Sequence, residues 1–212
     1  LGNLFITILY AYPISRRDLK GRTFFSFVLF FTILFNGGLI PTYMMWTNTF
    51  HIKNTYLAYL LPNLLMNGFY VIMARNFFAA NIPFELLESA KIDGAGEVRI
   101  LKNIVIPMSK PILATLGLFV SLNYWNDWQN GLYYISNDNM YTIQVLLNRM
   151  LLDALYMQQG LSKEISSSIG AAMPTSTLKM AIAVLGAVPV LIIFPFIARY
   201  LTGGIVVGAV EG

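Results

Sequence analysis

A strongly charged stretch between two apolar runs is the feature that most constrains how this chain folds. Residues 85–111 read ELLESAKIDGAGEVRILKNIVIPMSKP. The charged side chains of this stretch are Glu85, Glu88, Lys91, Asp93, Glu97, Arg99, Lys102 and Lys110. Charged groups are costly inside hydrocarbon. The stretch therefore indicates a helix-competent element that lies at a membrane surface and docks something in the water phase.

The composition is that of an integral membrane protein. Of the 212 residues, 57% are hydrophobic and only 11% are charged, whereas ordinary soluble domains carry roughly 25% charged residues. We therefore predict an all-α, polytopic helical membrane protein with a single transmembrane domain over residues 1–212. The net charge of +4 is interpreted as membrane orientation rather than nucleic-acid binding. With no cysteine and one histidine, His51, no disulfide and no metal site is predicted.

Local signals predict two short helices inside the charged stretch. Pro83 suits the first helical position, where its missing N–H is no loss. Glu85 falls near the positive end of the helix dipole, and Lys91 falls near the negative end. Gly94 can take the left-handed conformation that closes a helix, and a second helix is predicted over 97–103. Together they form an elbow that lies along the membrane surface.

Apolar segments predict the membrane spans. The first apolar segment, residues 1–14, is too short to cross the hydrocarbon core of a membrane, which is about 30 Å thick and needs roughly 20 helical residues. We interpret it as the second half of a span that starts upstream, in a chain that lacks its N-terminus. The predicted spans are about 1–14 (partial), 23–46, 54–74, 111–128 and 178–199.

The segments between these spans differ in character. Asn36, Gly37, Gly38 and Pro41 predict a kink inside the 23–46 span. Residues 75–110 form a loop on one side of the membrane. Residues 129–177 form a long segment on the other side, in which apolar residues at helical spacing predict a helix. The predicted apolar face consists of Ile143, Leu146, Leu147, Met150, Leu151, Ala154 and Leu155.

Basic residues predict the orientation, because they are enriched in cytoplasmic loops. The segments predicted to lie inside hold Arg16, Arg17, Lys20, Arg22, Arg75, Lys91, Arg99, Lys102, Lys110 and Arg199. Those predicted to lie outside hold Lys53, Arg149, Lys163 and Lys179. The 75–110 loop therefore faces the cytoplasm.

The spacing within this loop resembles the EAA loop of the permease subunits of bacterial ABC importers. Glu88, Ser89 and Ala90 are followed by Gly94, Ile104 and Pro107 at the intervals of the family pattern E-A-A-x3-G-x9-I-x-L-P. The sequence departs from that pattern at Ser89, where the family has alanine, and at Ile106, where it has leucine.

The resemblance covers nearly the whole chain. The segment AYPISRRDLKGR (11–22), the pair Trp125–Asn126 and the C-terminal GAVEG (208–212) are similar to the carbohydrate-uptake, MalG-like permeases, with Glu211 where lysine is usual. FNGGLIPTY (35–43) is similar to their LplC/YtcP-like branch.

Membership of that family implies a type I permease fold of six spans, of which about 4.5 are present here. It implies a location in the bacterial cell (inner) membrane and several partners: a second permease in a heterodimer, ABC ATPase subunits, and an extracellular or periplasmic solute-binding protein. The chain would bind no cofactor itself, since ATP and Mg²⁺ are used by the partner ATPase. The residues expected at the ATPase contact are Glu85, Glu88, Ser89, Ala90, Asp93, Gly94, Ile104 and Pro107.

Polar residues inside predicted spans are candidates for a substrate path, because they are costly in lipid. Amide side chains suit sugar hydroxyls, and aromatic faces suit a sugar ring. The candidates are Asn63, Asn67, Tyr70, Asn123, Tyr124 and Asn126. The alternative interpretation is that these asparagines bridge helices.

Two other functions are considered. One is a permease for peptides or amino acids. The other is a membrane-embedded enzyme with an inner-face active site, for which Asp93 and Glu97 are too few. On a basic inner loop these two carboxylates are more simply interpreted as docking or solvated charges. The chain also lacks a Walker-type Gly-Lys-Ser/Thr loop, so ATP hydrolysis is expected in a separate subunit, and no catalytic residue is predicted.

Overall fold

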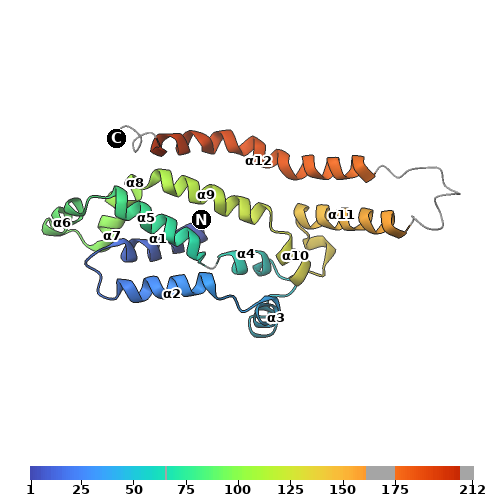
Figure 1. Cartoon of the computed structure of the whole chain (residues 1–212), viewed down its shortest axis with the longest axis horizontal. Helices are drawn as coiled ribbons and strands as arrows, with labels where there is room; N and C mark the ends of the chain where they lie inside the picture. Colours follow the sequence, from blue (N-terminus) through green and yellow to red (C-terminus); the bar gives the residue numbers. More distant parts are fainter. Residues whose placement is uncertain (65, 161–174, 206–212) are drawn as a thin grey trace. The chain divides into compact units, whose positions relative to one another are not determined.

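The computed structural model describes residues 1–64, 66–160 and 175–205, whose course is shown in Figure 1. The regular structure of these residues is entirely helical, which confirms the predicted all-α class. The α-helices are α1 (Gly2–Ser15), α2 (Arg22–Leu34), α3 (Leu39–Met44), α4 (Leu57–Leu64), α5 (Gly68–Asn81), α6 (Phe84–Ile92), α7 (Glu97–Ile100), α8 (Ile106–Met108), α9 (Lys110–Trp125), α10 (Gln129–Tyr134), α11 (Ile143–Gly160) and α12 (Thr175–Ile205). Shorter turns are π-helical at Met45–Thr49 and Leu101–Val105 and 3-10 at Asp138–Met140.

Among the described residues, no single helix is both long enough and apolar enough to cross a membrane. Two bent pairs of helices pass this requirement together: Arg22–Leu34 with Leu39–Thr49, and Glu97–Met108 with Lys110–Tyr134. Their bends are 106° and 82°. The first bend falls between α2 and α3, where the sequence predicts a kink.

The chain divides into two compact units. Of the described residues, the first contains those of Leu1–Thr42 and Leu61–Ser121 and those from Phe196 to Ile205, and the second contains those of Tyr43–Leu60 and Leu122–Pro195.

In the first unit, α1 packs against both α2 and α5, and α2 also contacts α5. On α5 the buried positions Val71, Ala74 and Phe78 recur at helical spacing and form one face. Gly68 permits the close approach of α5 to α2, since a Cβ there would lie 2.6 Å from Ile33 Cγ1. The core of this unit consists of Ala11, Tyr12, Ile14, Leu29, Val71, Ala74, Phe78, Ile82, Leu87, Ile100, Val105, Ile112 and Leu116.

The second unit is held together by aromatic side chains and by hydrogen bonds between its loops. The indole N–H of Trp125 donates to the carbonyl of Gly186 at 3.0 Å. The backbone N–H of Asn54 donates to the Tyr134 carbonyl at 2.9 Å, and the rings of Tyr43 and Tyr134 stack with centroids 5.7 Å apart. The last two contacts hold α10 against the turn that precedes α4 and against Tyr43.

Helix α11 confirms that the 129–177 segment contains a helix, but the predicted apolar face is buried only in part, at Leu147. Among the side chains of α11 whose burial the structure describes, Val145 and Leu147 are buried, whereas Ile143, Leu146 and Met150 are exposed. Periodicity identified the helix correctly but did not identify the side that packs within this chain. An apolar side chain can also face lipid, so apolar spacing alone does not mark the packed face.

Candidate functional site

The charged stretch forms the predicted elbow, which we define as residues 84–100, with α6 and α7 joined at 93–96. The N–H of Ala95 donates to the Ala90 carbonyl at 2.9 Å, and the N–H of Gly94 donates to the Lys91 carbonyl at 3.0 Å. Gly94 has φ +79°. This pair of bonds around a left-handed glycine is a Schellman closure, so the prediction that Gly94 ends a helix is confirmed.

Two details of the elbow differ from the sequence prediction. Pro83 lies one residue before α6 and acts as its N-terminal flanking residue, with ψ 133°, instead of occupying the first helical position. The second helix, predicted over 97–103, is α-helical only to Ile100. It then continues as the π-helical turn and α8 as far as Met108, because no residue with a helix-ending conformation lies between them.

The elbow has one buried face and one exposed face. Leu87 and Ile100 are buried in the core of the first unit. Four predicted contact residues with polar side chains lie on the exposed surface: Glu85, Glu88, Ser89 and Asp93. Gly94 is also exposed. This surface therefore offers carboxylates to the solvent next to a sharp turn.

The remaining predicted contact residues have different surroundings. Ala90 and Ile104 are half-buried and pack against the core of the first unit, so they lie on the side of the helices that faces away from the exposed surface. Pro107 is exposed and lies in α8.

Two exposed apolar side chains also belong to the solvent-exposed surface of the elbow, which we call its outer surface. They were not identified from the sequence. Ile92 is 86% exposed and Val98 is 79% exposed. Neither lies on the face marked by Leu87 and Ile100. The sequence did carry a signal for them, because both are apolar residues within a charged loop. Exposed apolar side chains that gather beside polar ones mark contact surfaces.

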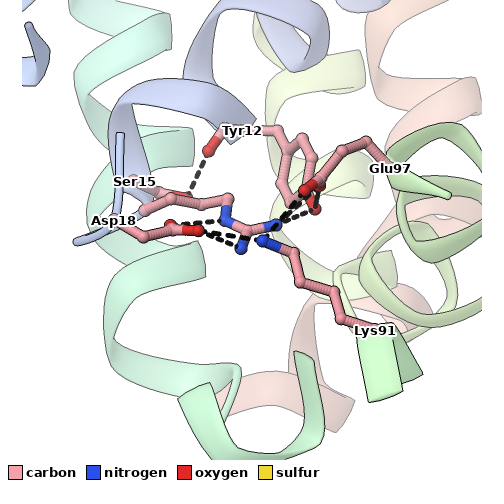
Figure 2. Close-up of polar contacts among 6 residues, drawn as sticks. Tyr12, Ser15, Asp18, Lys91 and Glu97 are labelled. Carbon is pink, nitrogen blue, oxygen red and sulfur yellow. Dashed lines mark hydrogen bonds and ion pairs between the residues drawn. The ribbon is translucent and has the colours of Figure 1, made fainter. Parts of the chain in front are cut away.

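A group of charged side chains fastens the end of α1 to the elbow. We call this group the clasp; it consists of Tyr12, Arg16, Asp18, Lys91 and Glu97. Figure 2 shows its polar contacts and labels four of its members: Tyr12, Asp18, Lys91 and Glu97. The Arg16 guanidinium, with its side chain 6% exposed, lies 2.6 Å from Asp18 through Nη2 and 2.6 Å from Glu97 through Nη1. Its Nε also donates to Asp18 Oδ1 at 2.9 Å, so the contact with Asp18 is bidentate.

The other two members close the clasp. The Tyr12 hydroxyl donates to Glu97 Oε2 at 2.8 Å and accepts from Arg16 Nη1 at 2.9 Å. Lys91 Nζ lies 2.9 Å from Asp18 Oδ2 and 3.1 Å from Glu97 Oε1. Each carboxylate therefore meets two cations, and the side-chain charges of the clasp balance.

The clasp shifts the pKa values of Asp18, Lys91 and Glu97 in the direction that keeps these side chains charged. Hydrogen bonds from Arg16 and Lys91 lower the pKa of Asp18 to about 2. Burial raises the pKa of Glu97, but hydrogen bonds from Tyr12 and Lys91 outweigh it, so the net pKa is lowered. The hydrogen bond to Asp18, followed by that to Glu97, raises the pKa of Lys91.

Sequence reasoning missed the clasp. It assigned Arg16 to membrane orientation and grouped Glu97 with Asp93 as docking or solvated charges. The structure separates these two carboxylates, because Asp93 is exposed at the turn while Glu97 pairs with Arg16 and Lys91. No local pattern marks a pair of residues 81 positions apart in the sequence.

The candidate substrate-path residues of the first unit are Asn63, Asn67 and Tyr70. Asn67 precedes α5, and its side-chain oxygen accepts from the N–H groups of Phe69 and Tyr70 at 3.0 and 3.4 Å. It is thus the N-cap of α5, a role that neither sequence interpretation gave it. The Tyr70 ring stacks on Phe119 with centroids 6.3 Å apart. Asn63 belongs to α4, and its side chain lies outside the description.

The candidates of the second unit lie at the end of α9. Asn123 and Asn126 are exposed. Tyr124 is half-buried, and its hydroxyl donates to the Leu60 carbonyl at 3.2 Å. The segment 208–212, with Glu211, lies outside the described residues. Within the described part of the chain, no three His, Cys, Asp or Glu side chains are placed to hold a metal ion.

Residues 3–207 match the family described as "Binding-protein-dependent transport system inner membrane component". The polygalacturonan/rhamnogalacturonan transport system permease protein YtcP of Bacillus subtilis (strain 168) is 40% identical over 99% of this chain and 71% of its own length. Protein LplC of the same organism is 35% identical over 99% of this chain and 68% of its own.

A solved structure shares the fold. It is the crystal structure of a bacterial ABC transporter involved in the import of the acidic polysaccharide alginate. One of its chains matches with a TM-score of 0.75 and 27% identity, over 94% of this chain and 69% of that one.

The chain therefore belongs to the family of inner membrane components of binding-protein-dependent transport systems. It is a permease subunit of an ABC importer and not an enzyme. Membership of this family implies that the chain is located in a membrane and works with an ATPase and a binding protein.

Proposed function

We propose that this chain pairs with a second, different permease in the bacterial inner (cell) membrane, as a multi-pass subunit, to form the translocation path for a sugar or oligosaccharide. The pair receives its substrate from a solute-binding protein outside. The ATPase subunits bind ATP and Mg²⁺, and this chain binds neither.

The elbow carries this proposal. Its outer surface combines the exposed carboxylates of Glu85, Glu88 and Asp93 with the exposed apolar side chains of Ile92 and Val98. Charged groups steer a partner toward a surface, and apolar groups stabilise the complex once water is excluded. Such a surface, on a loop predicted to face the cytoplasm, suits the ATPase subunit that the family implies.

The backbone of the elbow is rigid enough to transmit a displacement from the ATPase to the helices of this chain. Its turn is fixed by the Schellman bonds at Ala95 and Gly94, and its inner face is anchored by Leu87 and Ile100 in the core. A rigid element with one face anchored and one face free passes a displacement to the helices behind it, because packed cores do not deform continuously.

The substrate class follows from the relatives. YtcP is described as a polygalacturonan/rhamnogalacturonan permease, and the structural relative imports alginate. Both substrates are chains of sugars, and polygalacturonan and alginate are acidic. We therefore propose that the substrate is an oligosaccharide and not a peptide or an amino acid, and that acidic oligosaccharides are the preferred candidates.

Reconstitution tests this function. The chain is purified with its partner permease and ATPase, inserted into liposomes loaded with ATP and Mg²⁺, and supplied with the cognate binding protein. Labelled oligogalacturonide, a neutral oligosaccharide and a tripeptide are offered separately. We expect ATP-dependent uptake of a saccharide and none of the tripeptide. Uptake of the tripeptide alone would overturn the sugar assignment, and ATP hydrolysis by this chain in isolation would overturn the assignment of ATP hydrolysis to a partner.

A further inference from the structure

The clasp joins two parts of the chain that also share the apolar core of the first unit. Arg16 and Asp18 lie at and just beyond the end of α1, and Lys91 and Glu97 belong to the elbow. The ion pairs between these four side chains measure 2.6 to 3.1 Å. Apolar contacts are not directional, whereas a bidentate guanidinium fixes both distance and orientation.

The shape of the elbow does not require the clasp. Backbone bonds close α6 at Gly94 and Ala95, and Leu87 and Ile100 anchor the elbow in the core. The clasp members from the elbow are Lys91, at the end of α6, and Glu97, at the start of α7. They lie on opposite sides of the turn, so the clasp contacts both helices of the elbow, α6 and α7.

Stability alone does not account for the clasp either. Only Arg16 is buried, whereas the side chains of Asp18, Lys91 and Glu97 are 40%, 37% and 54% exposed. Solvent screens these ion pairs, so they contribute only modestly to stability. A buried arginine that contacts two carboxylates and a tyrosine hydroxyl specifies one geometry. What the clasp contributes is therefore a fixed orientation of the elbow relative to α1.

We propose that the clasp makes the end of α1 and the elbow move as one body, so that displacement of the elbow by the ATPase is transmitted to α1. Arg16 is the central positioning residue, and Asp18, Lys91, Glu97 and Tyr12 hold it. This inference rests on the proposed coupling function of the elbow. Without the clasp, the elbow would still dock the ATPase but would rotate against α1, and ATP would be hydrolysed with less substrate moved.

The test measures substrate transported per ATP hydrolysed in the reconstituted importer. Arg16→Lys keeps the charge but removes the planar fork, and Glu97→Gln removes one carboxylate charge. Arg17→Gln is the matched control, since Arg17 is the exposed neighbour of Arg16 and has no ion pair within the described part of the chain. We expect both clasp variants to co-purify with the ATPase and to lose about fivefold or more in this ratio, the lower end of allosteric coupling. The control should keep it.

A chemical rescue makes the test independent of folding defects. The chain has no cysteine, so Asp18→Cys with Lys91→Cys introduces its only thiols, one on each side of the clasp. In an importer whose other subunits lack accessible thiols, this variant should be poorly coupled. A short bifunctional maleimide should restore the ratio, while a monofunctional maleimide should not.

Several outcomes would overturn the inference. They are a wild-type ratio in assembled Arg16→Lys, a double-cysteine variant that needs no cross-linker, thiols that do not cross-link, and a cross-linked variant that stays uncoupled. If the wild-type importer itself moves no substrate, the proposed function fails and not the clasp alone. If the wild type transports while the clasp variants match it, only the clasp inference fails.

Discussion

The guanidinium of Arg16 and the carboxylate of Glu97 are separated by 81 positions in the sequence and by 2.6 Å in the structure. This pair connects the segment after the first helix with the turn of the elbow. The elbow therefore has two supports, an apolar one through Leu87 and Ile100 and a charged one through the clasp. We expect the two supports to respond differently to mutation and to pH, so that their contributions can be separated.

Gly94→Ala tests the closure of α6. At φ +79° an alanine is strained by about 1–2 kcal/mol, so we expect a lower melting temperature of the purified permease complex and weaker retention of the ATPase. Gly96→Ala is the matched control, since Gly96 has φ −71° and nothing within 4 Å of an added Cβ. Equal effects of the two substitutions would contradict a conformational role for Gly94.

Ile92→Ser tests the apolar part of the docking surface. Because Ile92 is 86% exposed, its loss should leave the stability of the permease nearly unchanged. It should weaken ATPase binding by roughly tenfold, or about 1.4 kcal/mol, measured by titrating the ATPase onto the detergent-purified permease. Ile40→Ser, at a position 71% exposed outside the elbow, is the control. If Ile40→Ser weakens binding as much as Ile92→Ser, the docking surface is wrongly drawn.

Local signals in the sequence predicted the elbow well. The turn at Gly94 and the charges at the ends of α6 act within a few residues, so their effect is readable from spacing alone. Asn67 also had a readable local signal, an asparagine directly before a helix, but its place inside a predicted span suggested a substrate contact instead of a cap.

The clasp and the packed side of α11 were beyond such reasoning. A charged residue such as Glu97 looks the same in the sequence whether it is solvated or paired with a distant arginine. On α11, apolar side chains that pack, such as Val145, cannot be told from exposed ones, such as Ile143, when lipid also accepts apolar surface. The span boundaries and the residues of the substrate path stay predictions.

Glu88→Lys tests the charge of the docking surface. The substitution places a cation on an exposed position of α6, where it reverses the local field offered to the ATPase. We expect uptake to be abolished while membrane insertion is intact, as measured by transport and by the amount of chain in the membrane fraction. Ser89→Ala restores the family pattern next to it and should transport normally. Normal uptake by Glu88→Lys would remove Glu88 from the coupling role.

A cysteine at position 96 tests the orientation. Gly96 is exposed in the turn of the elbow, and the chain has no other thiol. Gly96→Cys should react with a membrane-impermeant maleimide in inside-out vesicles and not in intact cells, as detected by a mass shift of the chain. Labelling from the outside would invert the topology. Lys53→Cys, in a segment predicted to lie outside, should show the opposite pattern.

The pH dependence of stability tests the charged support separately. The pKa of Asp18 is lowered from 3.8 to about 2 in the folded chain, so the contribution of this carboxylate is present above pH 3.8 and is lost as the pH falls through about 2. Asp18→Asn should therefore melt at a lower temperature than the wild type at neutral pH, and this difference should shrink as the pH is lowered across that window. Because the Asp18 side chain is 40% exposed, solvent screens its ion pairs.

The control for this pH test is Asp93→Asn, which removes an exposed carboxylate of the elbow outside the clasp. Its melting temperature should follow that of the wild type through the same window. A constant difference between Asp18→Asn and the wild type from neutral pH down to pH 2 would show that the charge of Asp18 does not stabilise the fold. The loss of the difference only in the Asp18 variant would place the acid-sensitive contact at the clasp, between α1 and the elbow.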